Sequence, residues 1–164
     1  MFKYTVINTR LGWLALACSQ KGLVLLTLPQ KSRNAALSQM KDFIDAGIED
    51  ATAFGDLAQR LQRYFDGEQV LFPDRLALSG ATAFQRAVWS MARAIPYGET
   101  RSYAWVAGSI GRPHAVRAVG GALARNSIPI IVPCHRVIAS DGGLCGFSGG
   151  LELKRRLLEL ESAH

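Results

Sequence analysis

Apolar and polar residues alternate through the first 28 positions of the chain, a period of two that is typical of half-buried β-strands. Three such stretches run from Phe2 to Asn8, from Trp13 to Cys18 and from Leu23 to Leu28. Because the turns between them are short, neighbouring stretches pair most simply with each other. The pattern predicts a small antiparallel sheet.

After this sheet the apolar residues recur at intervals of three and four, which is the period of an amphipathic helix. Helices are predicted over Asn34 to Ala46 and over Phe54 to Phe65, and Gly67 ends the second one. A turn-rich stretch follows, with a short strand at Leu76 to Leu78. We expect residues 1–80 to form an N-terminal α/β domain.

The next part of the chain has a helical pattern. Thr82 and Gln85 have the spacing of a capping box ahead of apolar residues at helical intervals, and this helix ends before Pro96. Ser102 can cap a second helix that runs to Ile110. Two helices are therefore expected in close succession.

A third helix, His114 to Arg125, is predicted directly after a break at Gly111, and Pro113 stands where helices accept proline. Two short helices joined by a tight glycine-containing turn form a helix-turn-helix, whose second member lies against a DNA groove in DNA-binding proteins. Such helix pairs are also common in packed bundles. The pattern alone therefore leaves DNA binding open.

The end of the chain combines three kinds of segment. The β-branched residues at Ile128 to Val132 predict a buried extended segment, Asp141 to Gly150 a glycine-rich loop, and Leu151 to Glu161 an amphipathic helix. We expect residues 81–164 to form a second, mostly helical domain that carries the helix-turn-helix.

The 164-residue chain contains no unbroken apolar run of the length that a membrane span needs, and its start does not resemble a signal peptide. We therefore expect a soluble cytoplasmic protein. Its three cysteines, Cys18, Cys134 and Cys145, include no C-x-x-C pair and are too few for a disulfide framework. Free thiols and no metal site are expected.

Positive charge is concentrated in the second half of the chain. Residues 1–80 contain nine basic and eight acidic side chains, whereas residues 81–164 contain ten and five. Between Arg86 and Arg136 there are seven arginines and a single acid, Glu99. A surface that faces phosphates has this asymmetry, although a basic soluble surface would have it too.

Cys134 is the candidate nucleophile. It precedes His135 and Arg136, and a thiol beside cationic groups is expected to have a lowered pKa and more reactive thiolate. A buried structural cysteine is the alternative, but it gives no reason for the basic neighbours. Because adjacent side chains diverge, Cys134 and His135 would communicate through a water or across a helical turn, with a carboxylate of the last helix orienting the imidazole.

The segment around Cys134 resembles the active-site signature of the O6-alkylguanine-DNA alkyltransferases. From about residue 80 onward, further motifs follow in the order and spacing of that family, whereas earlier residues resemble it only in length and general pattern. The matching segments are Phe84–Trp89, Tyr97–Tyr103, Arg117–Ala122, Asn126, Ile131–Val137, Ser148–Gly150 and Leu157–Glu161.

The resemblance implies an enzyme that reverses DNA damage directly, moving an alkyl group irreversibly from guanine O6 to Cys134 in one turnover, without a cofactor. It implies that His135 deprotonates Cys134 through a water, that Glu161 orients His135, and that Tyr103 supports rotation of the nucleotide and donates a proton toward guanine N3. Repair of O4-alkylthymine is left open.

The resemblance also implies a monomer that binds double-stranded DNA through the minor groove. Arg117 would enter the base stack in place of the flipped nucleotide, since a stacked base blocks the approach of sulfur. The remaining residues expected at the DNA are Ser102, Ala115, Val116 and Arg125.

A substrate pocket and a hinge are carried over in the same way. Asn126 would tie the second helix of the motif to the active-site segment. The pocket would be formed by Pro129, Val137, Cys145, Phe147 and Ser148. Two of these residues depart from the family: Phe147 stands where many members have tyrosine, and Cys145 stands where the family often has a small residue. Cys145 would either narrow the pocket or place a second thiol near Cys134.

Two other classes of function are considered. A protein that binds lesions without transferring the alkyl group would not need Cys134, because relatives of that type carry tryptophan there. A cysteine hydrolase unrelated to DNA would need neither the arginine-rich segment between Arg86 and Arg136 nor an arginine on the second helix of the motif, where Arg117 stands.

Overall fold

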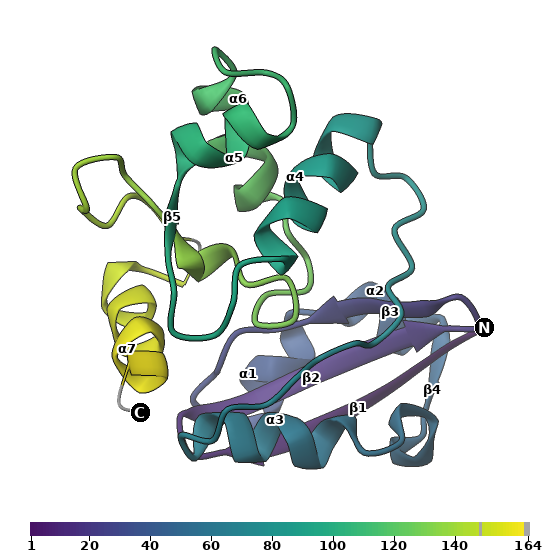
Figure 1. Ribbon diagram of the computed structural model, residues 1–164. Helices are drawn as coiled ribbons and strands as arrows, with labels where there is room; N and C mark the ends of the chain where they lie inside the picture. The colour runs from purple at the N-terminus through teal and green to yellow at the C-terminus, as the bar shows by residue number, and fades with distance from the viewer. Residues whose placement is uncertain (148, 163–164) are drawn as a thin grey trace. The chain divides into compact units, whose positions relative to one another are not determined.

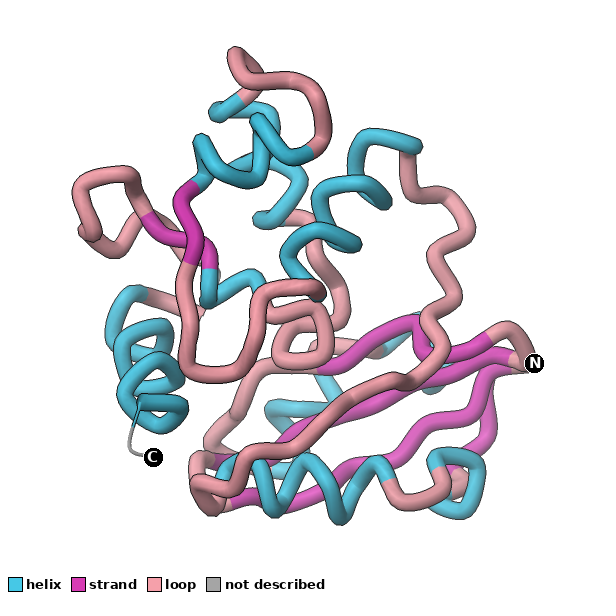
Figure 2. Tube along the Cα trace, viewed as in Figure 1, coloured by secondary structure: helices cyan, strands magenta, loops and turns pink. Residues whose placement is uncertain are grey.

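The computed structural model describes residues 1–147 and 149–162. The chain divides into two compact units, Met1–Leu78 and Ser79–His164, whose elements are shown in Figure 1 and, by type, in Figure 2. Among the described residues, none of the helices combines the length and apolar content needed to span a bilayer.

The first unit contains a four-stranded sheet in the order β3-β2-β1-β4. The meander predicted from the alternating pattern is present as β1 (Phe2–Thr9), β2 (Gly12–Ser19) and β3 (Gly22–Leu26), which pair antiparallel. The purely antiparallel prediction is wrong, however, because β4 (Gly47–Glu49) pairs parallel with β1. The sheet is therefore mixed.

Helices lie on both faces of this sheet, with α1 (Arg33–Ser38) and α2 (Lys41–Asp45) behind it and α3 (Leu57–Phe65) in front in Figure 1. Ala15 and Ala17 of β2 pack against Ala36 and Met40 on one side. Because successive strand residues face opposite sides, two-sided cover explains why four consecutive residues of β2 are buried.

The helical segments of this unit are shorter than predicted. The expected helix over residues 34–46 is interrupted between α1 and α2, and the expected helix over residues 54–65 is divided into η1 (Ala51–Phe54) and α3. Gly55, with φ of 57°, separates the latter pair, while Gly67, with φ of 95°, follows α3 as predicted. The strand expected at Leu76 is a single bridge to Leu23.

The second unit is mostly helical. α4 (Ala83–Arg93) begins with the predicted capping box of Thr82 and Gln85. α5 (Tyr103–Ser109) is capped by Ser102, whose hydroxyl accepts from the backbone N–H of Trp105. The last helix is α7 (Leu151–Ser162).

α6 (Val116–Ala124) is shorter than the predicted helix from His114 to Arg125. Pro113 therefore lies in the turn before the helix and not in its first turn. α6 packs against α4 and α5, and the indole N–H of Trp89 donates to the carbonyl of Ala122 over 2.8 Å.

A short parallel ladder that the sequence did not reveal connects the start of α5 to the segment after η2 (Cys134–Arg136). In it, β5 (Arg101–Ser102) pairs with β6 (Val137–Ile138). This pairing holds Tyr103, the first residue of α5, close to the segment that carries Cys134.

The segment before η2 is buried as predicted, but it is not extended. The N–H of Val132 donates to the carbonyl of Ile128, and Ile130 has a φ of 74°. A β-branched residue rarely adopts this left-handed conformation, and it is tolerated here because the surrounding packing fixes it. The chain therefore approaches Cys134 through a tight, strained turn.

Candidate active site

Asn126 holds this turn in place. Its side-chain amide donates to the carbonyl of Val132 over 2.9 Å, and its side-chain oxygen accepts from the N–H of Ile128 over 2.9 Å. The residue follows the end of α6 by two positions, so the two hydrogen bonds join that helix to the approach to Cys134.

Cys134 opens onto a cavity of about 370 Å³. A volume of this size is in the range of small-molecule sites. Its lining includes Tyr103 from α5 and Leu123 from α6, and Cys145 and Phe147 from the segment before α7. The cavity therefore brings together four residues predicted for the site, namely Cys134, Tyr103, Cys145 and Phe147.

The lowered pKa expected for Cys134 is wrong. Burial raises the pKa of the thiol above its ordinary value, and this effect outweighs a hydrogen bond from Asn126 and the positive charge of Lys154. The side chain is only 8% exposed. Cys134 is therefore mainly a thiol at neutral pH and needs a base before it can attack.

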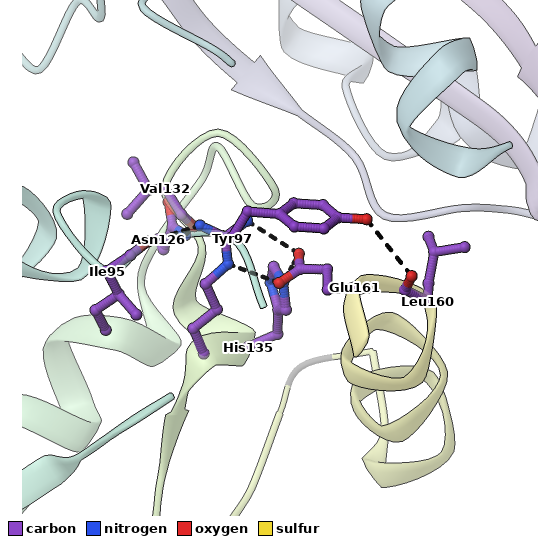
Figure 3. Close-up of polar contacts among 8 residues, drawn as sticks. Ile95, Tyr97, Asn126, Val132, His135, Leu160 and Glu161 are labelled. Carbon is purple, nitrogen blue, oxygen red and sulfur yellow. Dashed lines mark hydrogen bonds and ion pairs between the residues drawn. The ribbon is translucent and has the colours of Figure 1, made fainter. Parts of the chain in front are cut away.

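A buried ionic cluster joins η2 to Glu161 of α7, and Figure 3 shows Glu161 beside His135. His135 Nε2 is 2.7 Å from Glu161 Oε2, and Arg136 donates to both carboxylate oxygens, over 2.8 and 3.0 Å. Arg136 also donates to the carbonyl of Ile95 over 2.8 Å. Of the acids on the last helix, Glu161 is thus the one that meets the imidazole.

The charges within the cluster follow from this geometry. Burial alone would raise the pKa of Glu161, but hydrogen bonds from His135 and Arg136 outweigh it and lower the pKa to about 2. Burial lowers the pKa of His135, against the opposing pull of Glu161. At neutral pH the cluster contains a carboxylate, a guanidinium and a neutral imidazole.

Arg136 corrects the interpretation of the arginine-rich segment. Its side chain is buried against Glu161 and lies over the ring of Tyr97, so it does not face phosphates. Arg101 is paired with Glu99 over 2.8 Å. The charge asymmetry of the sequence therefore overstates the basic surface of this unit.

Lys154 is the functional candidate that sequence reasoning missed. Its fully buried ammonium group donates to the carbonyls of Val137 and Cys145, over 2.8 and 3.0 Å, and lies 3.5 Å from the hydroxyl of Tyr103. Burial lowers its pKa. The residue belongs to a Lys-Arg-Arg run that suggests a solvated helix face.

The sequence nevertheless contained a pattern that indicates a buried Lys154. Lys154, Leu157 and Glu161 are spaced by three and four positions, so they lie on one stripe of α7, and all three are buried. A polar residue on the stripe of a buried leucine is expected to bind a specific partner.

The residues expected at the DNA lie on and around α5 and α6. Ser102 caps α5, while Ala115 precedes the first residue of α6 and Arg125 follows its last. Val116 and Arg117 occupy the first turn of α6, where both are exposed. The structure therefore places these five residues near the ends of two neighbouring helices.

The remaining pocket residues differ in their placement. Pro129 and Val137 are buried and do not belong to the described lining of the cavity. Ser148 lies outside the described residues. Within the described part of the chain, no group of three or more His, Cys, Asp or Glu side chains is arranged to hold a metal ion.

Both units match models of one protein family. Residues 2–78 match the ribonuclease-like domain of 6-O-methylguanine DNA methyltransferase, and residues 83–163 match the DNA binding domain of the same enzyme.

Individual relatives agree with these matches. A methylated-DNA–protein-cysteine methyltransferase of Methanosarcina barkeri is 44% identical over 96% of this chain and 96% of its own length. The crystal structure of the Mycobacterium tuberculosis O6-methylguanine methyltransferase has a TM-score of 0.82 at 43% identity, covering 99% of this chain and 94% of that one. A second structure of the M. tuberculosis protein, in complex with DNA, has a TM-score of 0.82 at 44% identity, over 98% and 93%. The family resemblance and the enzyme class inferred from the sequence are confirmed.

Proposed function

Because the chain belongs to the 6-O-methylguanine DNA methyltransferase family, we propose that it repairs O6-alkylguanine in DNA by moving the alkyl group onto the sulfur of Cys134. The observation that carries the proposal is the placement of Cys134 at a cavity that Tyr103 also lines, while the next residue, His135, is bound to the carboxylate of Glu161.

The proposed reaction is a displacement at the alkyl carbon. The thiolate of Cys134 forms a carbon–sulfur bond while the carbon–O6 bond breaks, and the electron pair of that bond stays on guanine, which takes up one proton. A thioether has no easy leaving route. Each protein molecule therefore acts once.

His135 supplies the base in this proposal. The raised pKa of Cys134 leaves little thiolate at neutral pH, and the lowered pKa of His135 keeps its imidazole neutral and able to accept a proton. Nε2 of His135 is engaged by Glu161, so the proton would arrive at Nδ1, by way of a water. Glu161 orients the ring and stabilises the imidazolium that forms.

Tyr103 supplies the proton that the departing guanine requires. Its hydroxyl is at the cavity, and burial raises its pKa, which makes the loss of a proton to bulk water unfavourable. The ammonium group of Lys154, 3.5 Å away, would stabilise the phenolate or return the proton to it. The pair therefore keeps the leaving base neutral.

The DNA contacts are proposed for the region around α5 and α6, used as a helix-turn-helix in the minor groove. Arg117, exposed in the first turn of α6, would occupy the space of the flipped base, and Ser102, Ala115, Val116 and Arg125 would contact the strand around it. Flipping is needed because Cys134 is buried at the cavity and a base stacked in the duplex blocks the approach of its sulfur.

Asn126 is proposed as the hinge that connects α6 to the turn before Cys134, since its amide binds both sides of that turn. Once in the cavity, guanine would meet Cys145 and Phe147. The carbonyl of Val137 already accepts from Lys154, so a guanine amino group would use its second lone pair. Pro129 and Ser148 complete the proposed pocket.

We further propose that the protein acts as a monomer, in the cytoplasm and without a cofactor.

O4-alkylthymine is a second proposed substrate, because it presents an alkylated oxygen on a smaller ring.

The test is a stoichiometric repair assay with a duplex that carries one O6-methylguanine. We expect one guanine to be restored per protein molecule, followed by no further repair, and none with Cys134→Ser. A protein that binds the lesion but restores no guanine, or that turns over repeatedly, would contradict the proposal.

A further inference from the structure

The cavity at Cys134 contains a second thiol. Cys145 lies between β6 and α7 and lines the same cavity of about 370 Å³. The third cysteine, Cys18, lies on β2 in the other unit. The repair reaction proposed above uses only Cys134, so it gives no role to the thiol of Cys145.

Lys154 and Tyr103 are electrostatically linked to both cysteines of the cavity. Each thiol interacts electrostatically with the Lys154 ammonium group and with the Tyr103 hydroxyl. The carbonyl of Cys145 accepts directly from Lys154 Nζ over 3.0 Å, and the same nitrogen donates to Val137, three residues after Cys134. One buried cation therefore links the backbone of both cysteine segments.

The backbone around Cys145 has room to adjust. A Cβ atom added at Gly146 would meet no atom within 4 Å, so the position after Cys145 faces open space. A further turn precedes it, in which the N–H of Ala139 donates to the carbonyl of Gly143 over 2.9 Å. A disulfide requires a specific geometry of the two sulfur atoms, and this glycine-rich segment is the part of the cavity wall that would move to reach it.

The two thiols also differ in access. Cys145 is exposed, whereas Cys134 is buried. A dissolved oxidant therefore reaches Cys145 first, and the buried thiol then meets an oxidised sulfur within its own cavity. In redox-sensitive proteins a reactive cysteine is oxidised first, and a resolving cysteine then forms the disulfide with it. Here Cys145 has the first role and Cys134 the second.

We propose that Cys134 and Cys145 form an intramolecular disulfide when the protein meets a peroxide, and that this bond reversibly withholds Cys134 from alkyl transfer. The loss of transfer rests on the proposed function; the disulfide itself does not.

The disulfide forms in two steps, with hydrogen peroxide as the oxidant. The thiolate of Cys145 attacks one oxygen of hydrogen peroxide, which gives a sulfenic acid and, after protonation, one water. Cys134 then attacks the sulfenic sulfur, hydroxide leaves as a second water, and the S–S bond forms. The two thiols lose two electrons and two protons in total, and the peroxide is reduced to two waters.

The disulfide would protect a residue that can react only once. An unpartnered sulfenic acid at Cys134 can proceed to sulfinic acid, which is irreversible for most proteins. A disulfide stops oxidation at a level from which a dithiol restores both thiols.

The test uses the full-length protein treated with hydrogen peroxide, followed by intact mass and peptide mapping without reduction. We expect a protein lighter by two hydrogen atoms, with a crosslink between the peptides of Cys134 and Cys145. Methyl transfer to O6-methylguanine duplex should fall in parallel with the crosslink and return after dithiothreitol.

Two variants complete the experiment. Cys18→Ser should form the same crosslink, whereas Cys145→Ser should form none and, relative to its own untreated activity, should show no loss of methyl transfer that dithiothreitol reverses. Separate oxidation of the two cysteines, or a crosslinked protein that keeps full methyl transfer, would overturn the proposal. If the reduced protein transfers no methyl group, the proposed repair function fails, and the crosslink still supports the disulfide.

Discussion

The substitution His135→Gln tests the proton path, because glutamine can still bind Glu161 but is no base. Burial raises the pKa of Cys134 above 9.0 and lowers that of His135 below 6.5. Between these values the wild-type protein contains a thiol and a neutral imidazole. A reaction in which the imidazole takes the proton then has a rate that does not change with pH over that window.

The magnitude follows from the same pKa values. At pH 7 a thiol of pKa 9 or higher is at most about 1% ionised, so forming the thiolate without a base costs at least about 2.7 kcal/mol. In the wild type His135 takes the proton as the sulfur attacks, so no free thiolate is needed; His135→Gln must draw on the ionised fraction and should react on the order of 100-fold more slowly at pH 7. Its rate should still be rising about tenfold per pH unit at pH 9, because the pKa of Cys134 lies above that value.

The assay is the single-turnover rate with free O6-benzylguanine between pH 6.5 and 9.0, which are the ordinary pKa values of the two groups. Using the free base removes DNA binding from the measurement. Glu159→Gln, on the exposed side of the same helix as Glu161, is the matched control and should keep the flat profile. A constant ratio between wild type and His135→Gln across the range would refute the role of His135 as the base.

Three further substitutions probe the rest of the site. Glu161→Gln should lower the free energy of unfolding by on the order of 3 kcal/mol near neutral pH, measured by urea denaturation. Because the folded pKa is lowered to about 2 from 4.5, this difference should persist above pH 4.5 and vanish as the pH falls toward 2; an equal difference at all pH values would contradict the assignment. Lys154→Met removes the ammonium group that lies 3.5 Å from the Tyr103 hydroxyl, so methyl transfer should slow by on the order of 100-fold, as when one charge-stabilising donor is lost, and an unchanged rate would exclude Lys154 from the proton path. Arg117→Ala should slow repair of duplex DNA by on the order of 100-fold, because flipping costs a few kcal/mol, but should leave the reaction with free O6-benzylguanine unchanged; equal losses on both substrates would refute its role in flipping.

Local signals in the sequence predicted much of the fold. The alternating pattern located β1 to β3, and the capping residues Thr82 and Ser102 located the starts of α4 and α5. These features depend on near neighbours along the chain, which is why single-sequence reasoning finds them. The three residues of β4 are too few to show a period, so its parallel pairing was missed.

Features decided by tertiary packing were not predicted. The β-branched residues before Cys134 favour an extended strand, but the amide of Asn126 binds both sides of the segment and holds it as a turn. Burial raises the pKa of Cys134, although basic residues follow it in the sequence. Lys154 and Arg136 appeared as surface charges because their partners are distant in sequence.

The central claim is that the sulfur of Cys134, and no other group, receives the alkyl carbon. The most direct measurement is intact mass and peptide mapping of the protein after it meets a duplex that carries one O6-methylguanine. The account predicts a protein heavier by one CH₂ group, located on the peptide of Cys134, with Cys18 and Cys145 unmodified. A methyl group on another residue, or an unmodified protein beside restored guanine, would contradict it.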